Sequence, residues 1–361
     1  MQFMHVSRKN KKKIYGSIYG GYVGDALGFL VEGHSKEYIQ QYYIPKILNG
    51  EVFKMGRGYN KKTKLNGPIY KKDIDDCEWF YPFGQYTDDS QLSRLVLETI
   101  SENKGFFNFK KYGTKIAKIF FNKEIIGYGN STKKAAEKLY NLIDYKFSGT
   151  QNALSNGSAM RSDIFGLLFN DQKLYKVVTN CSMMTHMSAR AAAGSMCISS
   201  FVNTAFNSDS SKKFDIHEFL NNAFVLISNI DKEYAKYLLE FPLILRMNNE
   251  DAYKLIQSYD TINWGENKIS SGVTSSTLYS IYCFLKNPHC YKDCIIMALS
   301  AGGDVDTIAK MAGSISGAFL GIEFIPQEFI NKLNDNEKWC KKDINNLINT
   351  VFNYNYIKIK Y

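Results

Sequence analysis

Residues 14–30 read IYGSIYGGYVGDALGFL, and this stretch is the first indication of the fold class. Apolar and small residues recur at helical spacing, with glycines at 16, 20, 21 and 24. Each glycine costs a helix about 1 kcal/mol relative to alanine, so four of them need a reason. Close packing of another helix, or a ligand beside the backbone, would be such a reason. We therefore expect a buried helix that ends near Gly28 and is followed by Glu32.

Helical periodicity also dominates the rest of the chain. Residues 50–82 are polar and rich in Gly, Lys and Asp, which predicts a long connection over one face. Strand-like alternation is scarce, so we predict an all-α protein, with a basic N-terminal tail (1–13) before one compact domain (14–355). The other helical patterns cover residues 88–100, 107–122, 132–145, 171–183, 188–206, 215–229, 231–240, 249–258, 273–286, 289–299, 305–320 and 342–352.

Composition narrows the class of protein and its partners. The chain has 361 residues, of which 45% are apolar and 22% are charged, as in ordinary soluble domains. A net charge of +10 can attract polyanions, but no nucleic-acid motif accompanies it. We therefore expect a solvated basic surface and do not expect a nucleic-acid partner. Nothing indicates an oligomer, and a monomer is the default expectation.

The cysteines and the apolar runs indicate which cellular compartment to expect. The seven cysteines form an odd set without a C-x-x-C pair, which disfavours a disulfide scaffold and a structural zinc site. The basic N-terminus lacks an apolar stretch of signal-peptide length, and no run approaches the roughly 20 apolar residues of a membrane span. We predict a cytoplasmic protein that is not secreted and makes no membrane contact. The run RKNKKK leaves a nuclear location as an alternative.

Two acidic segments, each at the start of a predicted helix, are the main candidates for chemistry. GQYTDDSQL carries Thr87, Asp88 and Asp89, and SAGGDVDTIAKMAG carries Asp304, Asp306 and Thr307. Helix capping is a strong alternative for each segment alone, because Ser, Thr and Asp are preferred N-caps. If the two helix starts face each other, however, four carboxylates converge at a cost that a divalent cation would relieve. All-oxygen ligands select Mg²⁺, Ca²⁺ or Mn²⁺ over zinc or copper. The Ca²⁺ loop pattern is absent, which favours Mg²⁺, either as one ion or as a pair about 3.5–4 Å apart.

Three further segments could line a binding site. Asn156, Gly157 and Ser158 in NALSNGSAMRS predict a turn whose amides could hold an anion or ribose hydroxyls, although an ordinary Asn-Gly turn is the alternative. His186 stands before a small-residue helix, where a structural role is the alternative. GYGNSTKKA places Gly127, Gly129, Ser131 and Thr132 before a helix, as phosphate-binding loops do. Glu32, after the glycine-rich helix, is a further acidic candidate for the site, and an exposed loop glutamate is the alternative.

Taken in order, these segments resemble the ADP-ribosylglycohydrolase family. The similar stretches are GGYVGDALGFLVEG, GQYTDDSQLSRLVLETI, GYGNSTKKAAEKL, SNGSAMR, MTHMSARAAAG and LSAGGDVDTIAKMAGSISGAFLG, which together span residues 20–321. The resemblance implies an all-α orthogonal multi-helix bundle with two Mg²⁺ ions in a cleft. It implies that the ions are held by Thr87, Asp88, Asp89, Asp304, Asp306 and Thr307.

The resemblance also implies roles for the remaining candidates. Glu32 matches an acidic residue that gates or assists the chemistry in some members, and the segment from Asn156 to Met160, together with His186, matches the lining of the ADP-ribose site. Departures are few. Ser90 replaces the usual second threonine, Leu154 stands where some members carry an aromatic residue that stacks on adenine, and SDIFG after Arg161 lacks the usual proline.

The implied reaction is hydrolysis of the bond between C1 of the distal ribose and a modified side chain or another ADP-ribose-linked group. Such cleavage passes through an oxocarbenium-like state, and either Glu32 or Asp89 could act as the general base. The main alternative is a catalytically silent ADP-ribose-binding protein. A structural protein on the same fold, like the lens crystallins related to this family, is less favoured because every implied metal ligand is present.

Overall fold

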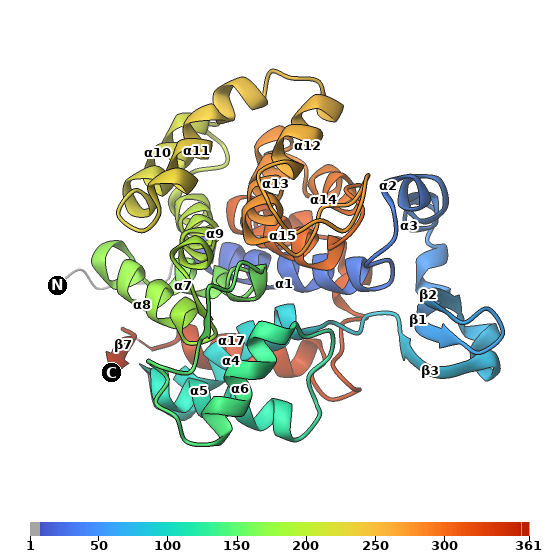
Figure 1. The fold of residues 1–361 in the computed structure, drawn as a ribbon, viewed down its shortest axis with the longest axis horizontal. Helices are drawn as coiled ribbons and strands as arrows, with labels where there is room; N and C mark the ends of the chain where they lie inside the picture. Colours follow the sequence, from blue (N-terminus) through green and yellow to red (C-terminus); the bar gives the residue numbers. More distant parts are fainter. Residues whose placement is uncertain (1–7, 355, 361) are drawn as a thin grey trace.

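The computed structural model describes residues 8–354 and 356–360, and 61% of the protein is helical. The predicted all-α fold class is confirmed (Figure 1). The α-helices of the described residues are α1 (Arg8–Phe29), α2 (Lys36–Tyr38), α3 (Ile44–Leu48), α4 (Asp88–Glu102), α5 (Phe109–Phe121), α6 (Asn130–Tyr140), α7 (Asp163–Leu168), α8 (Asp171–Met183), α9 (Ala189–Asn207), α10 (Ile216–Ile227), α11 (Lys232–Ile244), α12 (Asn249–Gln257), α13 (Val273–Lys286), α14 (Tyr291–Leu299), α15 (Val305–Leu320), α16 (Gln327–Ile330) and α17 (Lys341–Phe352).

Short elements complete the described chain. The strands are β1 (Met55–Asn60), β2 (Leu65–Tyr70), β3 (Cys77–Pro82), β4 (Phe106–Asn108), β5 (Thr150–Gln151), β6 (His186–Met187) and β7 (Lys358–Lys360). A π-helical segment η1 (Ile39–Tyr43) and the 3-10 helices η2 (Glu51–Lys54), η3 (Lys71–Asp76), η4 (Asn156–Ser158) and η5 (Ile322–Phe324) lie between them. β4 pairs with β7 and β5 with β6, each in parallel.

Helices α1 and α15 run antiparallel through the centre of the molecule, with their backbones in contact (Figure 1). A Cβ atom on Gly20 would lie 2.4 Å from the carbonyl oxygen of Gly313, and one on Gly24 would lie 2.2 Å from that of Ala309. Close helix packing, one of the two explanations offered for the glycine-rich stretch, is therefore correct. No side chain larger than hydrogen fits at these positions without a shift of the helices.

This antiparallel pairing brings the end of α1 to the start of α15. A Cβ atom on Gly28 would lie only 2.3 Å from the Cα atom of Asp306. Gly302 and Gly303 have φ angles of +70° and +81°, values that favour glycine, and they form the predicted sharp turn before α15. The Gly303 amide donates to the His34 carbonyl oxygen at 2.9 Å, which ties this turn to the segment that follows α1. Glu32 thereby lies beside the second acidic segment.

The other helices pack in groups around this central pair (Figure 1). α9 and α13 pack directly against α15, and α10 packs against α9 and α11. On the opposite side of α1, α4 contacts α5 and α17, and α5 contacts α6. The core is one continuous cluster of buried apolar side chains that draws on α1, α4, α9, α13 and α15. The first turns of α4 and α15 face the same interior region, which sets the position of the site described below.

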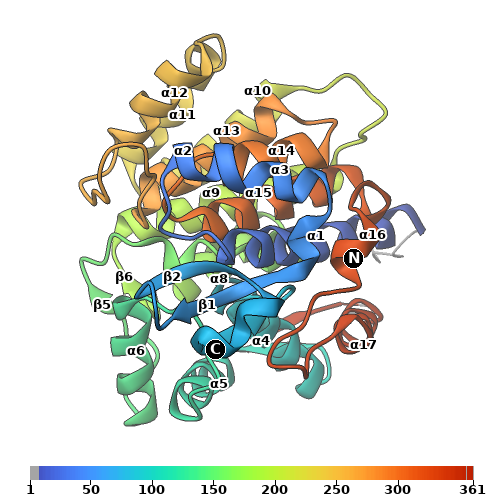
Figure 2. The ribbon, with the colours of Figure 1, turned by 90° about the vertical axis from the view of Figure 1, so that its right-hand side faces the viewer.

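Residues 50–82 differ from the sequence prediction. They form a three-stranded antiparallel sheet in the order β2-β1-β3, together with η2 and η3. The sheet lies at the right-hand side of the molecule in Figure 1, the side that faces the viewer in Figure 2. The prediction of an irregular connection was wrong because these strands lack the usual alternation of apolar and polar residues. β1 reads MGRGYN and β2 reads LNGPIY, so Gly and Pro replace the β-branched residues that signal a strand.

The predicted N-terminal tail is also corrected. Helix α1 begins at Arg8, so residues 8–13 of that segment are helical, and residues 1–7 lie outside the described residues. Lys13 is buried, and its ammonium donates to the carbonyl oxygens of Ala205 at 2.9 Å and Phe206 at 3.3 Å, at the end of α9. The apolar periodicity begins only at Ile14, so the sequence did not predict that the helix extends to the basic residues before it.

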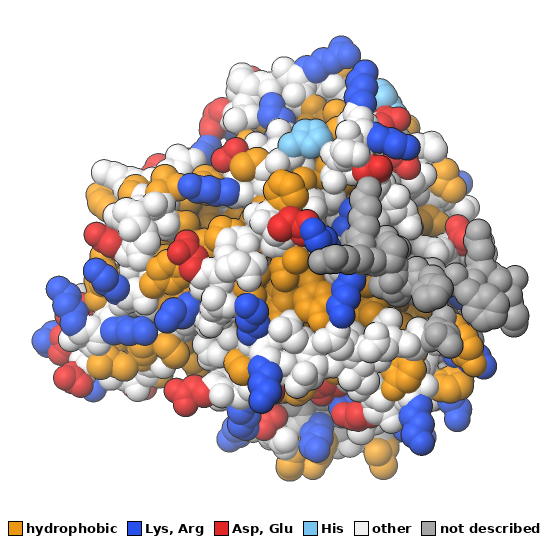
Figure 3. Space-filling model, turned by 180° about the vertical axis from the view of Figure 1, so that it is seen from behind, with side chains coloured by type: hydrophobic (Ala, Val, Ile, Leu, Met, Phe, Trp, Pro, Cys, Tyr) orange, Lys and Arg blue, Asp and Glu red, His pale blue; other side chains and the backbone are white. Residues whose placement is uncertain are grey.

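The described part of the chain contains no helix with the length and apolar character needed to cross a membrane. Basic side chains on the face drawn in Figure 3 are interspersed with acidic, apolar and uncharged ones.

The backbone contact between α1 and α15 makes Gly20→Ala a sharp test of the fold. Helix propensity alone predicts that alanine stabilises a helix by about 1 kcal/mol relative to glycine. We expect the opposite sign, a loss of about 1–3 kcal/mol, because the new methyl group would overlap the Gly313 carbonyl oxygen. Urea unfolding measures the difference. Asn221→Ala is the control, because it places alanine at an exposed position inside α10, where helix propensity alone predicts a gain. An increase in the stability of Gly20→Ala would contradict the packing.

Candidate active site

A polar cavity of 390 Å³ lies where α4, α6 and α15 begin. Its wall combines segments that lie far apart in the sequence: the loop that follows α1, the first turn of α4, the loop into α6, the turn around η4 and the start of α15. The lining residues are Glu32, Asp88, Asp89, Gly127, Tyr128, Gly129, Asn130, Ser131, Thr132, Ser155, Asn156, Gly157, Met160, His186, Trp264, Ser271, Asp304, Asp306 and Thr307.

Capping does not account for the first aspartate pair. Thr87 is the N-cap of α4, and its hydroxyl oxygen accepts from the Asp89 amide. The buried carboxylate of Asp25 accepts from the Thr87 and Ser90 amides, at 3.0 and 3.1 Å. Thr87, Asp25 and the Ile126 carbonyl oxygen, which accepts from the Asp88 amide at 2.7 Å, thus satisfy the free N–H groups of this helix start. The carboxylates of Asp88 and Asp89 are therefore not needed as caps.

The second pair is placed in a similar way. Asp304 is the N-cap residue of α15, but its side chain accepts no amide of that helix. Instead it accepts from the Asn156 side-chain amide at 2.6 Å. Asp306 lies in the first turn, and Thr307 donates to the Asp89 carboxylate at 3.4 Å, which links the two acidic segments. The hypothesis that the two segments meet at one place is therefore correct in geometry.

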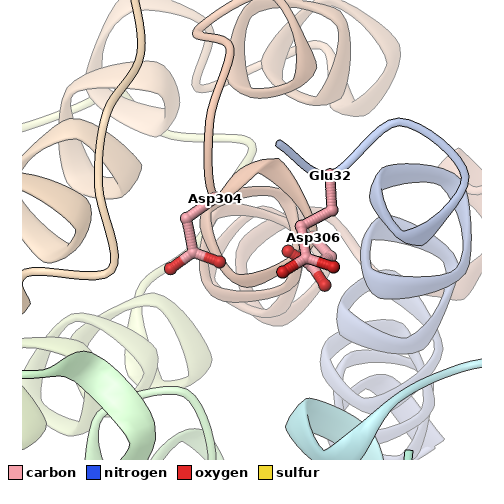
Figure 4. Close-up of side chains that lie close together, drawn as sticks. All are labelled: Glu32, Asp304 and Asp306. Carbon is pink, nitrogen blue, oxygen red and sulfur yellow. The ribbon is translucent and has the colours of Figure 1, made fainter. Parts of the chain in front are cut away.

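The most compact acidic group contains Glu32 as well as the second pair. Carboxylate oxygens of Glu32, Asp304 and Asp306 lie within 4.8 Å of one another (Figure 4). Asp88 and Asp89 line the same cavity outside this group. The sequence argument treated Glu32 as a catalytic residue only, because no spacing rule links it to α15. Its side chain is positioned equally well to hold a cation.

Burial and like charge dominate the electrostatics of the aspartates in this cavity. Burial, and then the neighbouring carboxylates, raise the pKa values of Asp88 and Asp306 well above the usual range. Burial and the nearby Glu32 raise the pKa of Asp304 to about 7. Two buried oxygens, Oδ1 of Asp89 and Oδ1 of Asp306, have no hydrogen-bond partner among the described residues. Buried, unpartnered carboxylate oxygens that face one cavity are the donor set that a hard divalent cation requires.

Glu32 is held at the edge of the cavity by the sheet. Arg57 of β1 lies 3.2 Å from the Glu32 carboxylate and also donates to the Phe29 carbonyl oxygen at the end of α1. The Glu32 side chain is 24% exposed, and burial together with Asp306 raises its pKa, which Arg57 opposes. Arg57 was not predicted as a site residue, because the segment that carries it was expected to be a long connection.

His186 is a neutral member of the wall. Its Nε2 lies 3.0 Å from the Ser155 hydroxyl and its Nδ1 lies 2.8 Å from the Thr185 hydroxyl. Burial, and then Arg161, lower its pKa to about 3, so the ring carries no charge at neutral pH. With both ring nitrogens engaged, His186 supports the Asn156 turn and has no free nitrogen for proton transfer.

Most of the predicted binding residues line the cavity. Gly127, Gly129, Asn156, Gly157 and Met160 all face it, and η4 forms the predicted turn. Two predicted site residues lie behind the wall instead. The Thr87 hydroxyl donates to Asp25 and Asp89, and the Ser158 hydroxyl accepts from Ser182 and Ser195.

Two aromatic residues of the wall were missed. Tyr128 and Trp264 line the cavity and are 42% and 38% exposed. Leu154, at the position where the resemblance implied an aromatic residue, is not among the lining residues. An isolated tryptophan in the polar segment INWGENK was the available signal.

Relatives of known function share this chain's sequence pattern over most of its length. ADP-ribosylhydrolase ARH3 of Mus musculus is 25% identical over 270 residues, which cover 68% of this chain and 72% of ARH3. ADP-ribosylarginine hydrolase Tri1 of Serratia proteamaculans is 22% identical over 298 residues, which cover 79% of this chain and 73% of Tri1.

A solved structure and the sequence model of a protein family indicate the same relationship as these two relatives. A solved chain of an ADP-ribosylglycohydrolase-related protein complex superposes with a TM-score of 0.66 at 16% identity, covering 96% of this chain and 99% of that one, so the two share a fold. The sequence model of the family described as ADP-ribosylglycohydrolase matches residues 6–357. The family expected from the motifs is thus confirmed, and the chain belongs to the ADP-ribosylglycohydrolase family.

Proposed function

We propose that this protein is a Mg²⁺-dependent hydrolase that cleaves the glycosidic bond between ADP-ribose and a modified protein side chain, or a related ADP-ribose compound. The observation that carries the proposal is the convergence of Glu32, Asp88, Asp89, Asp304 and Asp306 on one cavity. Membership of the family, and the printed activities of ARH3 and Tri1, support ADP-ribose as the substrate class.

The charge balance of the cavity supports a pair of divalent ions. Five carboxylates line it, and none of the described lining residues is Lys or Arg. One divalent ion offsets two of these charges and two ions offset four, which lowers the cost of burying such a cluster. The Asp304 and Asp306 oxygens would hold one ion beside Glu32, and Asp88 and Asp89 would contribute to the second. Mn²⁺ satisfies the same oxygen ligands.

The chain's own groups suggest how hydrolysis would proceed. A bound divalent ion would supply Lewis-acid stabilisation and lower the pKa of the attacking water. Amides around Gly127, Gly129 and Gly157 line the part of the wall suited to the diphosphate and ribose hydroxyls. Water would attack C1 of the distal ribose as the bond from C1 to the leaving oxygen or nitrogen breaks, and that leaving atom would take up a proton.

Glu32 is the better candidate for the general base. Its side chain is partly exposed at the cavity edge, within reach of a water molecule beside the ion that Asp304 and Asp306 would hold. Asp89 accepts hydrogen bonds from the hydroxyls of Thr87 and Thr307, which hold one of its oxygens in place. This arrangement suits Asp89 better to holding a cation than to moving a proton.

A panel of substrates tests the proposal. Peptides carrying ADP-ribose on Ser, Arg or Asp/Glu are incubated with the protein in Mg²⁺, Mn²⁺ or EDTA, and released ADP-ribose is measured. We expect turnover of at least one linkage with Mg²⁺ and none with EDTA. Binding of ADP-ribose without release from any substrate would favour the silent binder. Absence of both binding and turnover would favour a structural protein on this fold.

Tyr128 and Trp264 offer the adenine base an aromatic surface that Leu154 does not provide. We expect Trp264→Ala to weaken ADP-ribose binding by about 5- to 150-fold, because stacking of one base on an aromatic ring contributes about 1–3 kcal/mol. Isothermal titration with ADP-ribose measures the loss. Trp339→Ala tests a tryptophan outside the cavity, stacked on Arg94, and should leave the affinity unchanged in folded protein. Equal affinities of Trp264→Ala and wild type would place the base elsewhere.

A further inference from the structure

A buried ion pair lies directly behind the carboxylate cavity. The Lys310 ammonium of α15 is 2.5 Å from the Asp163 carboxylate at the start of α7, and the two side chains are 0% and 1% exposed. Neither residue lines the cavity or takes part in the hydrolysis proposed above. Asp163 belongs to SDIFG, the segment in which this chain departs from the family pattern. Burying two charges is costly, so the pair needs an explanation beyond stability.

Hydrogen bonds tie the pair to the cavity wall. The Lys310 ammonium donates to the Ser93 hydroxyl at 3.0 Å and to the carbonyl oxygen of Met160, a lining residue. The Ser93 hydroxyl is also 3.1 Å from the Asp89 carbonyl oxygen and from the Asp163 carboxylate. One ammonium therefore connects α15 with the Met160 turn and with the helix that carries Asp88 and Asp89.

The pair is oriented with its positive end toward the cavity. The ammonium contacts Met160, whereas the Asp163 carboxylate accepts from Ser314 at 2.8 Å, on the side where α15 packs against Gly21 of α1. The charge of Lys310 acts on Asp89, whose pKa is raised by burial and by Asp25 but lowered by Lys310. Because the ammonium is fully buried, solvent ions screen its charge only weakly.

We propose that Lys310 is a positioning residue that keeps a fixed positive charge behind the carboxylate cluster, stabilising the cation-free protein and limiting the affinity of the cavity for divalent cations. The inference rests on the proposed divalent site and adds a regulator of its affinity. The ammonium attracts the carboxylates when the cation is absent and repels the cation when it binds. The negative charge of Asp163 offsets part of the positive charge of Lys310. Removing Asp163 should therefore lower the cation affinity of the cavity, and removing Lys310 should raise it.

Thermal unfolding in a MgCl₂ series, starting from EDTA, tests this inference in the full-length protein. Asp163→Asn leaves the Lys310 charge uncompensated, and we expect its half-saturating Mg²⁺ concentration to rise about threefold or more. The double variant Lys310→Met with Asp163→Asn removes the pair. We expect its half-saturating concentration to fall about threefold or more, and its melting temperature in EDTA to be lower than that of wild type.

Lys13→Met is the matched control. Lys13 is also a buried lysine, but it lies near the start of α1, whereas the cavity lies beyond the end of that helix. We expect it to lower stability without changing the half-saturating Mg²⁺ concentration. Unchanged Mg²⁺ dependence in both Asp163→Asn and the double variant, or a threefold change in Lys13→Met, would overturn the role of Lys310. A wild type with no Mg²⁺-dependent shift would overturn the divalent site itself, and the inference with it.

Discussion

Asp304→Asn is expected to abolish most hydrolysis while leaving the fold intact. Asp304 shares the most compact carboxylate group with Glu32 and Asp306, so losing its charge removes a direct cation ligand. We expect activity to fall by more than the roughly 10- to 100-fold that removal of an outer-shell partner of a metal ligand costs. Stability in EDTA should be unchanged or higher, because one of several crowded negative charges is gone. ADP-ribose release and urea unfolding in EDTA measure the two effects.

The capping interpretation predicts a different pattern for this residue. Asn caps a helix about as well as Asp, so Asp304→Asn would then change little, whereas Asp304→Ala would cost about 1 kcal/mol. Asp293→Asn is the matched control, since Asp293 lies exposed in the first turn of the neighbouring helix α14. Wild-type activity in Asp304→Asn would remove Asp304 from the site.

Glu32→Gln is expected to lower turnover by about 10²- to 10⁴-fold, the usual contribution of a positioned general base. Glutamine keeps the size of the side chain and its contact with the segment after α1, so the melting temperature in EDTA should change little. The measurement is single-turnover release of ADP-ribose at saturating enzyme, which separates the chemical step from binding.

A neighbouring glutamate provides the control for this substitution. Glu37 is exposed in α2, five residues further along the chain, and Glu37→Gln should keep wild-type turnover. Equal turnover in Glu32→Gln and wild type would assign Glu32 to the loop alternative. Asp89 would then be the remaining candidate for the base.

Part of the fold could be predicted because its physical cause is local. The small-residue stretch of α1 indicated either close packing of another helix or a ligand beside the backbone, and the structure shows the first. The sequence did not identify α15 as the partner, because that depends on tertiary pairing. The sheet of β1, β2 and β3 was missed for a related reason: its ladder is made by the backbone, and its side chains carry little alternation.

The site, like the fold, could be predicted only in part. Asp88, Asp89, Asp304 and Asp306 were identified because paired carboxylates at helix starts exceed what capping needs. The functional partners of those residues were not identified, because their contacts depend on tertiary packing. Asp25 takes over the capping of α4, Arg57 reaches Glu32 from the sheet, and Lys310 lies behind Asp89. Asp25 and Lys310 lie within quoted motifs, but only the folded chain shows what their side chains contact.

The central claim is that two acidic segments more than 200 residues apart share divalent cations. The most direct test is a Mg²⁺ titration followed by thermal shift on wild type, Asp88→Asn and Asp304→Asn. We predict a Mg²⁺-dependent rise in melting temperature for wild type and a strongly weakened rise in both variants, although each variant changes only one segment. A wild-type rise in both variants, together with full activity, would contradict the shared site.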